Sequence, residues 1–226
     1  KPFDRFVVLT AEDQGYWGAL PNIRVIPNPL PFTSEETSSC KATKVVAVGR
    51  YDFQKNFSKL LQLWARIAPQ FPEWTLEIYG DGDQRCQLEQ EVKELGISSS
   101  VTLAQPTHKM KEVYLSASIY AMTSRYEGLP MVLIEAQQMG LPIVSFACPC
   151  GPRDVIHDGE DGFLIPMGED DIFLKALSTL MASEEKRVYM GQRAREASAR
   201  YEVDAVMNKW LTLFSELVPT KPTAGL

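Results

Sequence analysis

The chain has few of the residues that mark a metal centre, a disulfide framework or a membrane span. Only two histidines occur in 226 residues, and neither lies at a spacing typical of zinc ligands. We expect the four cysteines, Cys40, Cys86, Cys148 and Cys150, to be free thiols in a reducing, cytoplasmic compartment. No apolar run reaches the ~18 residues that a membrane span requires.

An excess of basic charge is also missing. The 29 acidic residues outnumber the 23 basic ones, and the formal net charge is −6. This balance argues against nucleic acid as a general partner. It also provides no obvious surface for docking on an anionic membrane. The composition, 45% hydrophobic and 23% charged, is typical of an ordinary globular protein.

From Lys44 onward, short apolar runs alternate with amphipathic segments. This alternation predicts an α/β fold, a Rossmann-like, doubly wound parallel sheet flanked by helices. The predicted strands cover residues 45–48, 74–79, 101–104, 119–123, 142–146 and 163–165. The predicted helices cover residues 57–68, 84–95, 110–116, 130–140, 170–182, 184–199 and 203–217.

The ends of the chain predict further parts. Two strand-like runs at 6–9 and 23–26 precede the prolines of residues 27–31, which interrupt regular structure. We expect residues 1–30 to be the remnant of a preceding domain with its linker, 31–218 to form the main domain, and 219–226 to be a disordered tail. The alternative is that the two early strands are edge strands of the main sheet. The sequence lacks an initiator methionine and opens within this pattern, which suggests a piece of a longer protein.

The last predicted helix carries a wide apolar stripe. One interpretation packs the stripe on the helix's own sheet. In the other, part of it is exposed or mediates self-association, because the domain that would cover it is absent. The stripe consists of Val203, Val206, Met207, Trp210, Leu211, Phe214 and Leu217.

Two carboxylates bracket a Gly-Leu-Pro turn after the strand at 119–123. Glu127 lies on the loop at the carboxyl end of this strand, and Glu135 lies inside the helix that begins at Pro130, the predicted first helical position. Ligands of doubly wound sheets bind where the strand order reverses, which for the order 3-2-1-4-5-6 lies between the first and fourth strands. Arg50 follows the first strand directly, so Arg50 and Glu127 are expected on one crevice.

Several ordered motifs resemble one enzyme family. They are Gly49-Arg50 with Lys55-Asn56, the stretch 79–83, the Glu-x7-Glu pair at 127 and 135, the stretch 151–154 and the stretch 158–165. Together they resemble retaining glycosyltransferases of the GT-B architecture, family 4 (glycosyl transferases group 1), in the C-terminal half that binds the nucleotide-sugar donor. The resemblance runs from about Val25 to beyond Arg195.

The resemblance implies roles for the basic loop and the backbone around it. Arg50 and Lys55 would bind the diphosphate, as a planar fork and a mobile point charge. The backbone amides of Gly128 and Leu129 would cradle the sugar or its phosphate. Taken alone, the two basic residues are equally compatible with a solvated loop.

The resemblance also implies roles for the two carboxylates. Glu135 would accept hydrogen bonds from the ribose hydroxyls, although a solvent-facing helical glutamate is the alternative. Glu127 would be the catalytic residue, with an electrostatic or orienting role. Whether the retaining reaction uses a nucleophilic carboxylate or front-face attack stays open.

Weaker expectations concern the other loops. Gln105 and Pro106 would hold the nucleobase edge, and Arg153 is either a donor contact or an ordinary surface arginine. The Asp-Gly-Asp sequence at 81–83 predicts a turn and helix cap, because it follows the second strand and the resembled family needs no metal.

The predicted activity is transfer of a sugar from a nucleotide-diphosphate donor, expected to be a UDP-sugar, with retention and without metal. The acceptor would be a glycan or lipid-linked glycan of polysaccharide biosynthesis, bound by a separate N-terminal domain. This chain alone would then bind donor but transfer poorly. The whole protein would be cytoplasmic, at the inner face of the membrane if it associates peripherally. An epimerase-like GT-B enzyme and a non-catalytic α/β interaction module remain alternatives.

Overall fold

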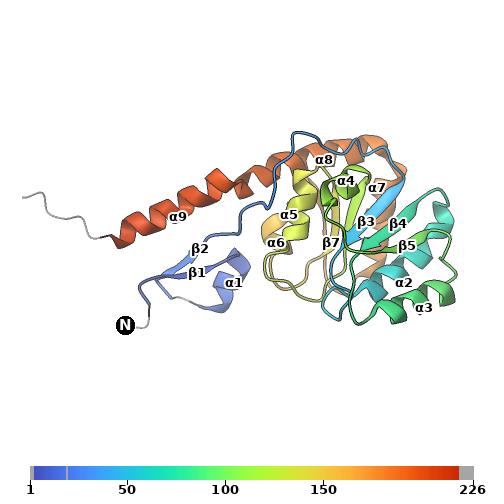
Figure 1. The fold of residues 1–226 in the computed structure, drawn as a ribbon, viewed down its shortest axis with the longest axis horizontal. Helices are drawn as coiled ribbons and strands as arrows, with labels where there is room; N and C mark the ends of the chain where they lie inside the picture. Colours follow the sequence, from blue (N-terminus) through green and yellow to red (C-terminus); the bar gives the residue numbers. More distant parts are fainter. Residues whose placement is uncertain (1–2, 19, 219–226) are drawn as a thin grey trace, which may run out of the picture.

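A six-stranded parallel sheet forms the centre of the computed structural model, which describes residues 3–18 and 20–218 (Figure 1). The strand order is β5-β4-β3-β6-β7-β8, with every neighbouring pair parallel. Counted within this sheet, the order is 3-2-1-4-5-6, so the predicted doubly wound fold is confirmed. The strands are β3 (Lys44–Val48), β4 (Thr75–Tyr79), β5 (Val101–Ala104), β6 (Ile119–Met122), β7 (Ile143–Phe146) and β8 (Gly162–Ile165).

Helices cover both faces of this sheet. They are α2 (Phe57–Ile67), α3 (Arg85–Glu94), α4 (Met110–Leu115), α5 (Met131–Gln138), α6 (Pro152–Val155), α7 (Asp170–Ala182) and α8 (Glu184–Ser198), with short 3-10 turns at Ala68–Gln70 and Ala199–Tyr201. Every residue of β6 and β7 is buried. These strands are apolar in sequence without alternation because both of their faces are covered.

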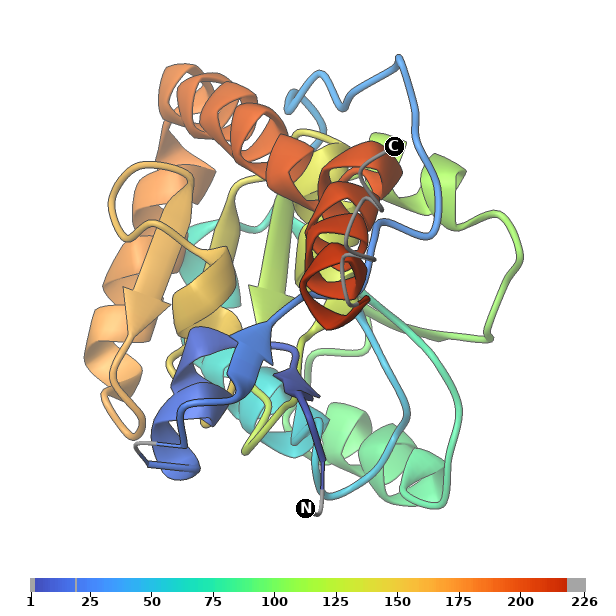
Figure 2. The ribbon, with the colours of Figure 1, turned by 90° about the vertical axis from the view of Figure 1, so that its left-hand side faces the viewer.

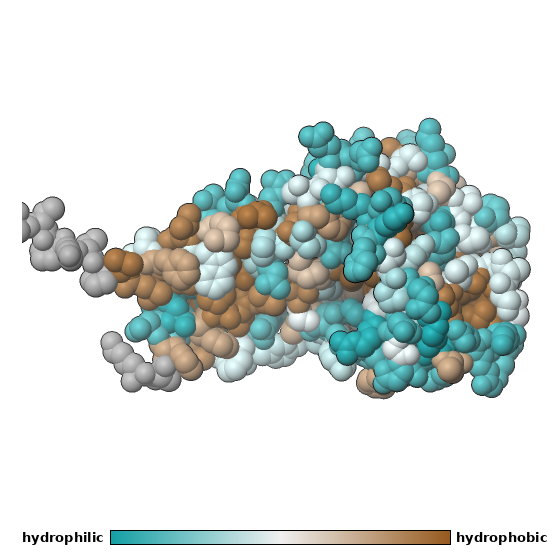
Figure 3. All heavy atoms as spheres, in the orientation of Figure 1, coloured by the Kyte–Doolittle hydropathy of each residue, from teal (hydrophilic) through white to brown (hydrophobic). Residues whose placement is uncertain are grey.

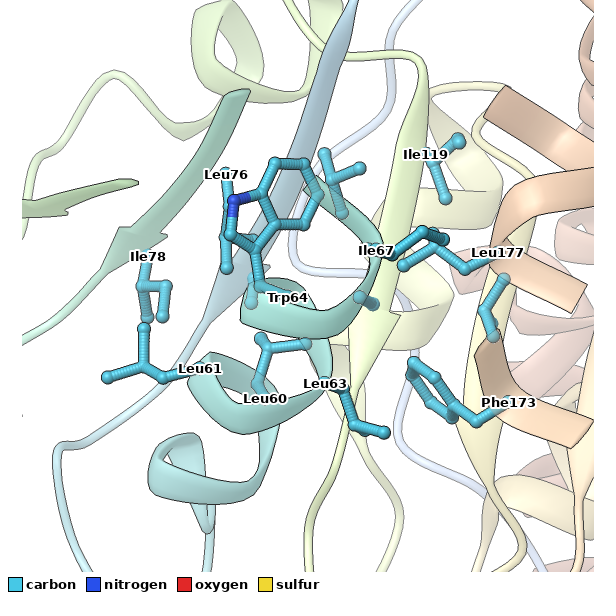
Figure 4. Packing of buried hydrophobic residues seen from close by; sticks show 14 of the residues in the cluster. Leu60, Leu61, Leu63, Trp64, Ile67, Leu76, Ile78, Ile119, Phe173 and Leu177 are labelled. Atoms are coloured by element: carbon cyan, nitrogen blue, oxygen red, sulfur yellow. The ribbon is translucent and has the colours of Figure 1, made fainter. Parts of the chain in front are cut away.

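The two faces of the sheet hold separate apolar clusters. Val45 and Ala47 of β3 point into one cluster, whereas Val46 between them points into the other, as the two-residue repeat of a strand requires. The first cluster packs α2, α3 and α7 on the sheet, and Figure 4 shows Trp64 of α2 and Phe173 of α7 within it. The second cluster packs α4 and α5, together with Val155 of α6.

The N-terminal segment forms a small unit of its own. β1 (Phe6–Val8) and β2 (Ile23–Val25) pair in parallel as a separate two-stranded sheet, connected by α1 (Ala11–Tyr16). They are therefore not edge strands of the main sheet, and that alternative is wrong. The last helix, α9 (Val203–Leu217), extends away from the main sheet and lies beside this unit (Figures 1 and 2).

The apolar stripe of α9 is only partly buried. Val206 and Leu213 pack on Ile26, which follows β2, and form a third cluster with Val7 and Trp210. The rest of the stripe is exposed, and Figure 3 shows apolar side chains gathered at this end of the molecule. The exposed members are Val203, Met207, Leu211, Phe214 and Leu217.

One expectation for helix α5 is wrong. α5 begins at Met131, so Pro130 is the N-cap residue and not the first helical residue. Pro130 has ψ of 90°, an extended conformation that lies outside the helix. The predicted tail at 219–226 lies outside the described residues. Among the helices that are described, none has both the length and the apolar character needed to cross a membrane.

Candidate functional site

Two loops meet where the strand order reverses. One follows β3 and the other follows β6, and both lie at the carboxyl edge of the sheet. The backbone N–H of Arg125 donates to the carbonyl of Gln54 at 2.8 Å. The side chain of Asn56 donates to the carbonyl of Thr123 at 3.2 Å and accepts from the Arg125 guanidinium at 2.8 Å. The two loops are therefore bonded directly to each other.

An ion pair connects these loops. The Lys55 ammonium lies 2.6 Å from Oε1 of Glu127, and their side chains are only 17% and 6% exposed. The Gln54 amide donates to Oε2 of the same carboxylate at 3.2 Å. Both oxygens of Glu127 thus have a partner from the opposite loop. Gly49 makes room for the lysine stem, because a Cβ at this position would lie 2.9 Å from Cε of Lys55.

The backbone of Glu127 is held by the loop after β7. Its N–H donates to the carbonyl of Pro149 at 2.6 Å, and its carbonyl accepts from Cys150 at 3.0 Å. The neighbouring thiol of Cys148 is buried, and burial, with a smaller contribution from the Glu127 charge, raises its pKa to about 12. This thiol is therefore protonated at neutral pH, whereas the thiolate is the nucleophilic form of cysteine. The four cysteines are free.

Arg50 lies beside an open cavity of about 350 Å³ at the carboxyl ends of β3, β4 and β5. Its side chain is 76% exposed, and within the described residues its one ionic contact is Nε to Asp52 at 3.7 Å. The structure brings Arg50 and Pro106 together in this cavity, whereas Gln105, Lys55 and the two glutamates are not among its lining residues. The lining consists of Val48, Gly49, Arg50, Tyr79, Gly80, Asp81, Pro106, Thr107 and Met110.

A larger cavity of about 500 Å³ lies elsewhere, between residues that precede β3 and helix α8. It is lined by Thr37, Ser38 and Cys40 on one side and by Gln192 and Arg195 on the other. Its position before β3 places it toward the amino ends of the strands. Parallel α/β sheets bind ligands at the opposite, carboxyl edge, so we assign the site to the smaller cavity and the adjoining ion pair.

Glu135 projects from α5 and is partly buried, in contrast to a solvent-facing helical glutamate. The phenol of Tyr114 donates to its Oε2 at 2.8 Å. Burial raises the pKa of the Glu135 carboxyl above its usual range, and the bond from Tyr114 offsets part of that rise. Sequence reasoning missed Tyr114, which lies on the apolar face of a predicted helix and carries no motif signal.

Arg153 lies in an ion pair with the N-terminal unit. Its guanidinium contacts Glu12 of α1 at 3.0 Å. The adjacent Asp154 accepts from the backbone N–H of Ala11 at 2.6 Å and of Glu12 at 3.3 Å. These contacts connect α6 to α1, and only the three-dimensional structure reveals this link between distant segments.

The expected helix cap at 81–83 is wrong, because the N-cap residue of α3 is Gln84, whose side chain makes no cap hydrogen bond within the described residues. Asp81 lies 3.6 Å from Arg85, within the turn that leads into α3. Over residues 3–18 and 20–218, no group of three or more His, Cys, Asp or Glu side chains is placed to hold a metal ion. The backbone at Gly128 is open, because a Cβ added there would meet no heavy atom within 4 Å, and Leu129 beside it is buried.

Comparison with known proteins identifies the family. A family model described as "Glycosyl transferases group 1" matches residues 33–197. The amylovoran biosynthesis glycosyltransferase AmsD of Erwinia amylovora is 37% identical over 92% of this chain and 61% of AmsD. An exopolysaccharide phosphotransferase of Streptomyces coelicolor is 34% identical over 95% of this chain and 24% of that protein. The chain thus spans less than two thirds of the length of these relatives.

The fold matches solved structures as well. A crystal structure of S. aureus TarM in complex with UDP, fondaparinux and alpha-GlcNAc-glycerol superposes with a TM-score of 0.84 at 22% identity, over 94% of this chain and 44% of TarM. At this identity the likeness concerns the fold alone. The sheet matches one of the Rossmann-like halves of the GT-B architecture. The chain belongs to the glycosyl transferases group 1 family.

Proposed function

We propose that this chain is the donor-binding half of a retaining family 4 glycosyltransferase that uses a UDP-sugar without a metal. The observation that carries the proposal is the meeting of two loops at the strand-order reversal. One brings Arg50 to the cavity, and the other brings Glu127 to Lys55 at 2.6 Å. A cationic rim beside a buried carboxylate suits a sugar diphosphate, whose leaving group gains charge during transfer.

In this proposal, the nucleobase would contact the cavity near Pro106, and the diphosphate would lie between Arg50 and Lys55. Arg50 is 76% exposed and its contact with Asp52 is long, at 3.7 Å, so its fork is available for phosphate oxygens. Lys55 has three N–H donors and uses one on Glu127, which leaves others for phosphate. The open backbone at Gly128 would face the sugar, together with the adjoining amide of Leu129.

The environment of Glu127 supports an orienting or electrostatic role. Both of its oxygens are bonded, one to Lys55 and one to Gln54, and its backbone is bonded to the loop after β7. The bonds from Lys55 and Gln54 occupy lone pairs that a nucleophilic carboxylate would direct at the anomeric carbon. A carboxylate held on both oxygens instead suits the stabilisation of positive charge on the sugar in the transition state.

The acceptor side of the reaction is also a proposal. By analogy with AmsD, which is named for amylovoran biosynthesis, the acceptor would be a growing glycan or a lipid-linked glycan. It would bind to a separate N-terminal domain of the whole protein, in the cytoplasm and at the inner face of the membrane. Residues 1–30 would then be part of that domain, and the chain by itself would bind donor with little turnover.

Calorimetric titration with UDP, GDP and ADP tests the proposal. We expect saturable binding of UDP, weakened at least about tenfold in Arg50→Glu, which corresponds to about 1.4 kcal/mol. Lys93→Glu is the matched control, because Lys93 is an exposed cation at the far end of α3 and its reversal leaves the cavity unchanged. Equal binding in the wild type and Arg50→Glu would contradict the phosphate role. An interaction module would bind none of the three nucleotides.

A further inference from the structure

Tyr114 connects two helices that flank the site. It lies on α4 and is fully buried, while its hydroxyl reaches across to Oε2 of Glu135 on α5 at 2.8 Å. Its ring packs against the ring of Tyr120 on β6, with centroids 6.2 Å apart. The hydroxyl of Tyr120 lies 3.3 Å from both the N–H and the carbonyl of Val48 at the end of β3. Tyr120 is thus bonded to a residue that lines the cavity.

The bond from Tyr114 fixes one half of the Glu135 carboxylate. A phenol has a single hydrogen to donate, and a carboxylate can only accept. Within the described part of the chain, no group bonds to the other oxygen, Oε1. One oxygen is therefore immobilised against the protein, and the other is free to accept from a ligand hydroxyl. A carboxylate held in one orientation loses little entropy when it binds such a hydroxyl.

The same helix face also reaches the cavity. Met110, the first residue of α4, lines the cavity, and Tyr114 lies one turn further along the same face. Both side chains pack in the cluster on this side of the sheet. Helix α4 thus connects the cavity assigned to the nucleobase with the carboxylate assigned to the ribose.

We propose that Tyr114 is a positioning residue that orients Glu135 and so gives the site its selectivity for ribose over 2′-deoxyribose in the donor nucleotide. The proposal rests on the proposed function, since it requires that Glu135 bind the ribose. A hydrogen bond between α4 and α5 that only stabilises the fold would not affect ribose selectivity when it is removed. Selectivity between two sugars is therefore the readout that separates the two roles.

A second readout is the pH dependence of binding. The groups that face Glu135 are Tyr114 from α4 and Tyr120 from β6, and burial raises the pKa of both phenols well above the usual tyrosine range. Both phenols are neutral at physiological pH, so of these three groups Glu135 alone changes charge between acidic and neutral pH. The bond from Tyr114 lowers the pKa of Glu135, and its removal raises that pKa further. UDP binding that requires the ionised Glu135 carboxylate then begins at higher pH than in the wild type.

The experiment is titration of the wild type, Tyr114→Phe, Glu135→Gln and Tyr201→Phe with UDP and 2′-deoxy-UDP, from acidic to neutral pH. We expect Tyr114→Phe to weaken UDP binding about three- to tenfold while changing 2′-deoxy-UDP binding less than about twofold, as one hydrogen bond is lost. Its UDP-binding profile moves to higher pH. The phenylalanine retains the buried ring, so the fold is kept.

Tyr201→Phe is the matched control. Its hydroxyl also donates from a buried ring, to the carbonyl of Asp154 at 3.1 Å, outside the proposed ribose contact. This variant keeps the wild-type preference for UDP. If Glu135→Gln loses that preference while Tyr114→Phe retains both the preference and the pH profile, the positioning role is overturned. If Glu135→Gln retains the preference for UDP, the ribose role of Glu135 is wrong. If the wild type does not bind UDP, both proposals are overturned.

Discussion

Gly151 shows how much of the crevice depends on single residues. It precedes α6 with φ of +91°, and an added Cβ would overlap the carbonyl oxygen of Gly128 and lie 2.5 Å from Cδ of Pro130. The loop after β7 therefore packs directly on the turn that follows Glu127. Glycine adopts positive φ without steric cost and has no Cβ, so this contact requires glycine.

We expect Gly151→Ala to lower the free energy of unfolding by about 2–4 kcal/mol, from backbone strain together with overpacking. Gly159→Ala is the matched control, since Gly159 also has positive φ, +79°, but no heavy atom within 4 Å of the added Cβ. It should cost only the conformational penalty of about 1–2 kcal/mol. Urea unfolding of both variants measures the difference, and equal losses would show that the contact with Gly128 is unimportant.

The buried carboxyl of Glu135 should lower the stability of the fold as pH rises. Burial raises its folded-state pKa above its unfolded-state value. Its contribution to stability is therefore complete below the ordinary glutamate range and is lost as pH rises through the raised folded pKa. We expect Glu135→Gln, which cannot ionise, to become more stable relative to the wild type across this window. Urea unfolding at a series of pH values tests the sign, and a constant difference would contradict it.

The residues of the site could be predicted only where a local motif carries them. Arg50, Lys55 and Glu127 lie in short patterns after strands, and the structure places all three along the same edge of the sheet. Gln54 and Tyr114 were missed, because their contacts with Glu127 and Glu135 span 73 and 21 residues along the chain. The partner of Arg153 was not foreseeable either, since Glu12 lies 141 residues away.

At the scale of helices and strands, prediction succeeded for the main sheet because its signals are local and its topology is restricted. Strands separated by amphipathic helices pair in parallel with short connections, which leaves few possible orders. The N-terminal unit is different, since its short strands β1 and β2 pair with each other and depend on α9 for cover. Neither the pairing of β1 with β2 nor their packing against α9 could be deduced from strand-like runs alone.

The packing of α9 on the N-terminal unit depends on a few buried side chains. Leu213 is 4% exposed and contributes to the cluster with Ile26, whereas Leu211 on the same helix is 61% exposed. We expect Leu213→Ala to reduce the opening free energy of β1 and β2 amides by about 2–4 kcal/mol. Leu211→Ala should change it by less than about 0.5 kcal/mol. Hydrogen exchange followed residue by residue measures both, and equal effects would show that this cluster does not hold the unit.

At the scale of the whole molecule, the apolar side chains are unevenly distributed. The main sheet is covered on both faces. Helix α9 exposes Met207, Leu211 and Phe214, whose spacing places them on one side of the helix. Figure 3 shows apolar side chains gathered at this end of the molecule. Phe3 and Trp17 of the N-terminal segment are exposed as well. An exposed apolar surface of this kind favours association. In the whole enzyme, we propose that the acceptor-binding domain covers it.

The isolated chain should therefore associate with itself through this surface. We expect sedimentation velocity to show a weight-average mass that rises with concentration, and Leu211→Glu with Phe214→Glu to suppress this rise, because two carboxylates on the stripe would have to be desolvated on contact. Tyr189→Glu is the control, since Tyr189 is also exposed, at 58%, but lies on α8. Unchanged association in the double variant would show that copies meet elsewhere. A monomer at every concentration would show that the exposed stripe does not drive association.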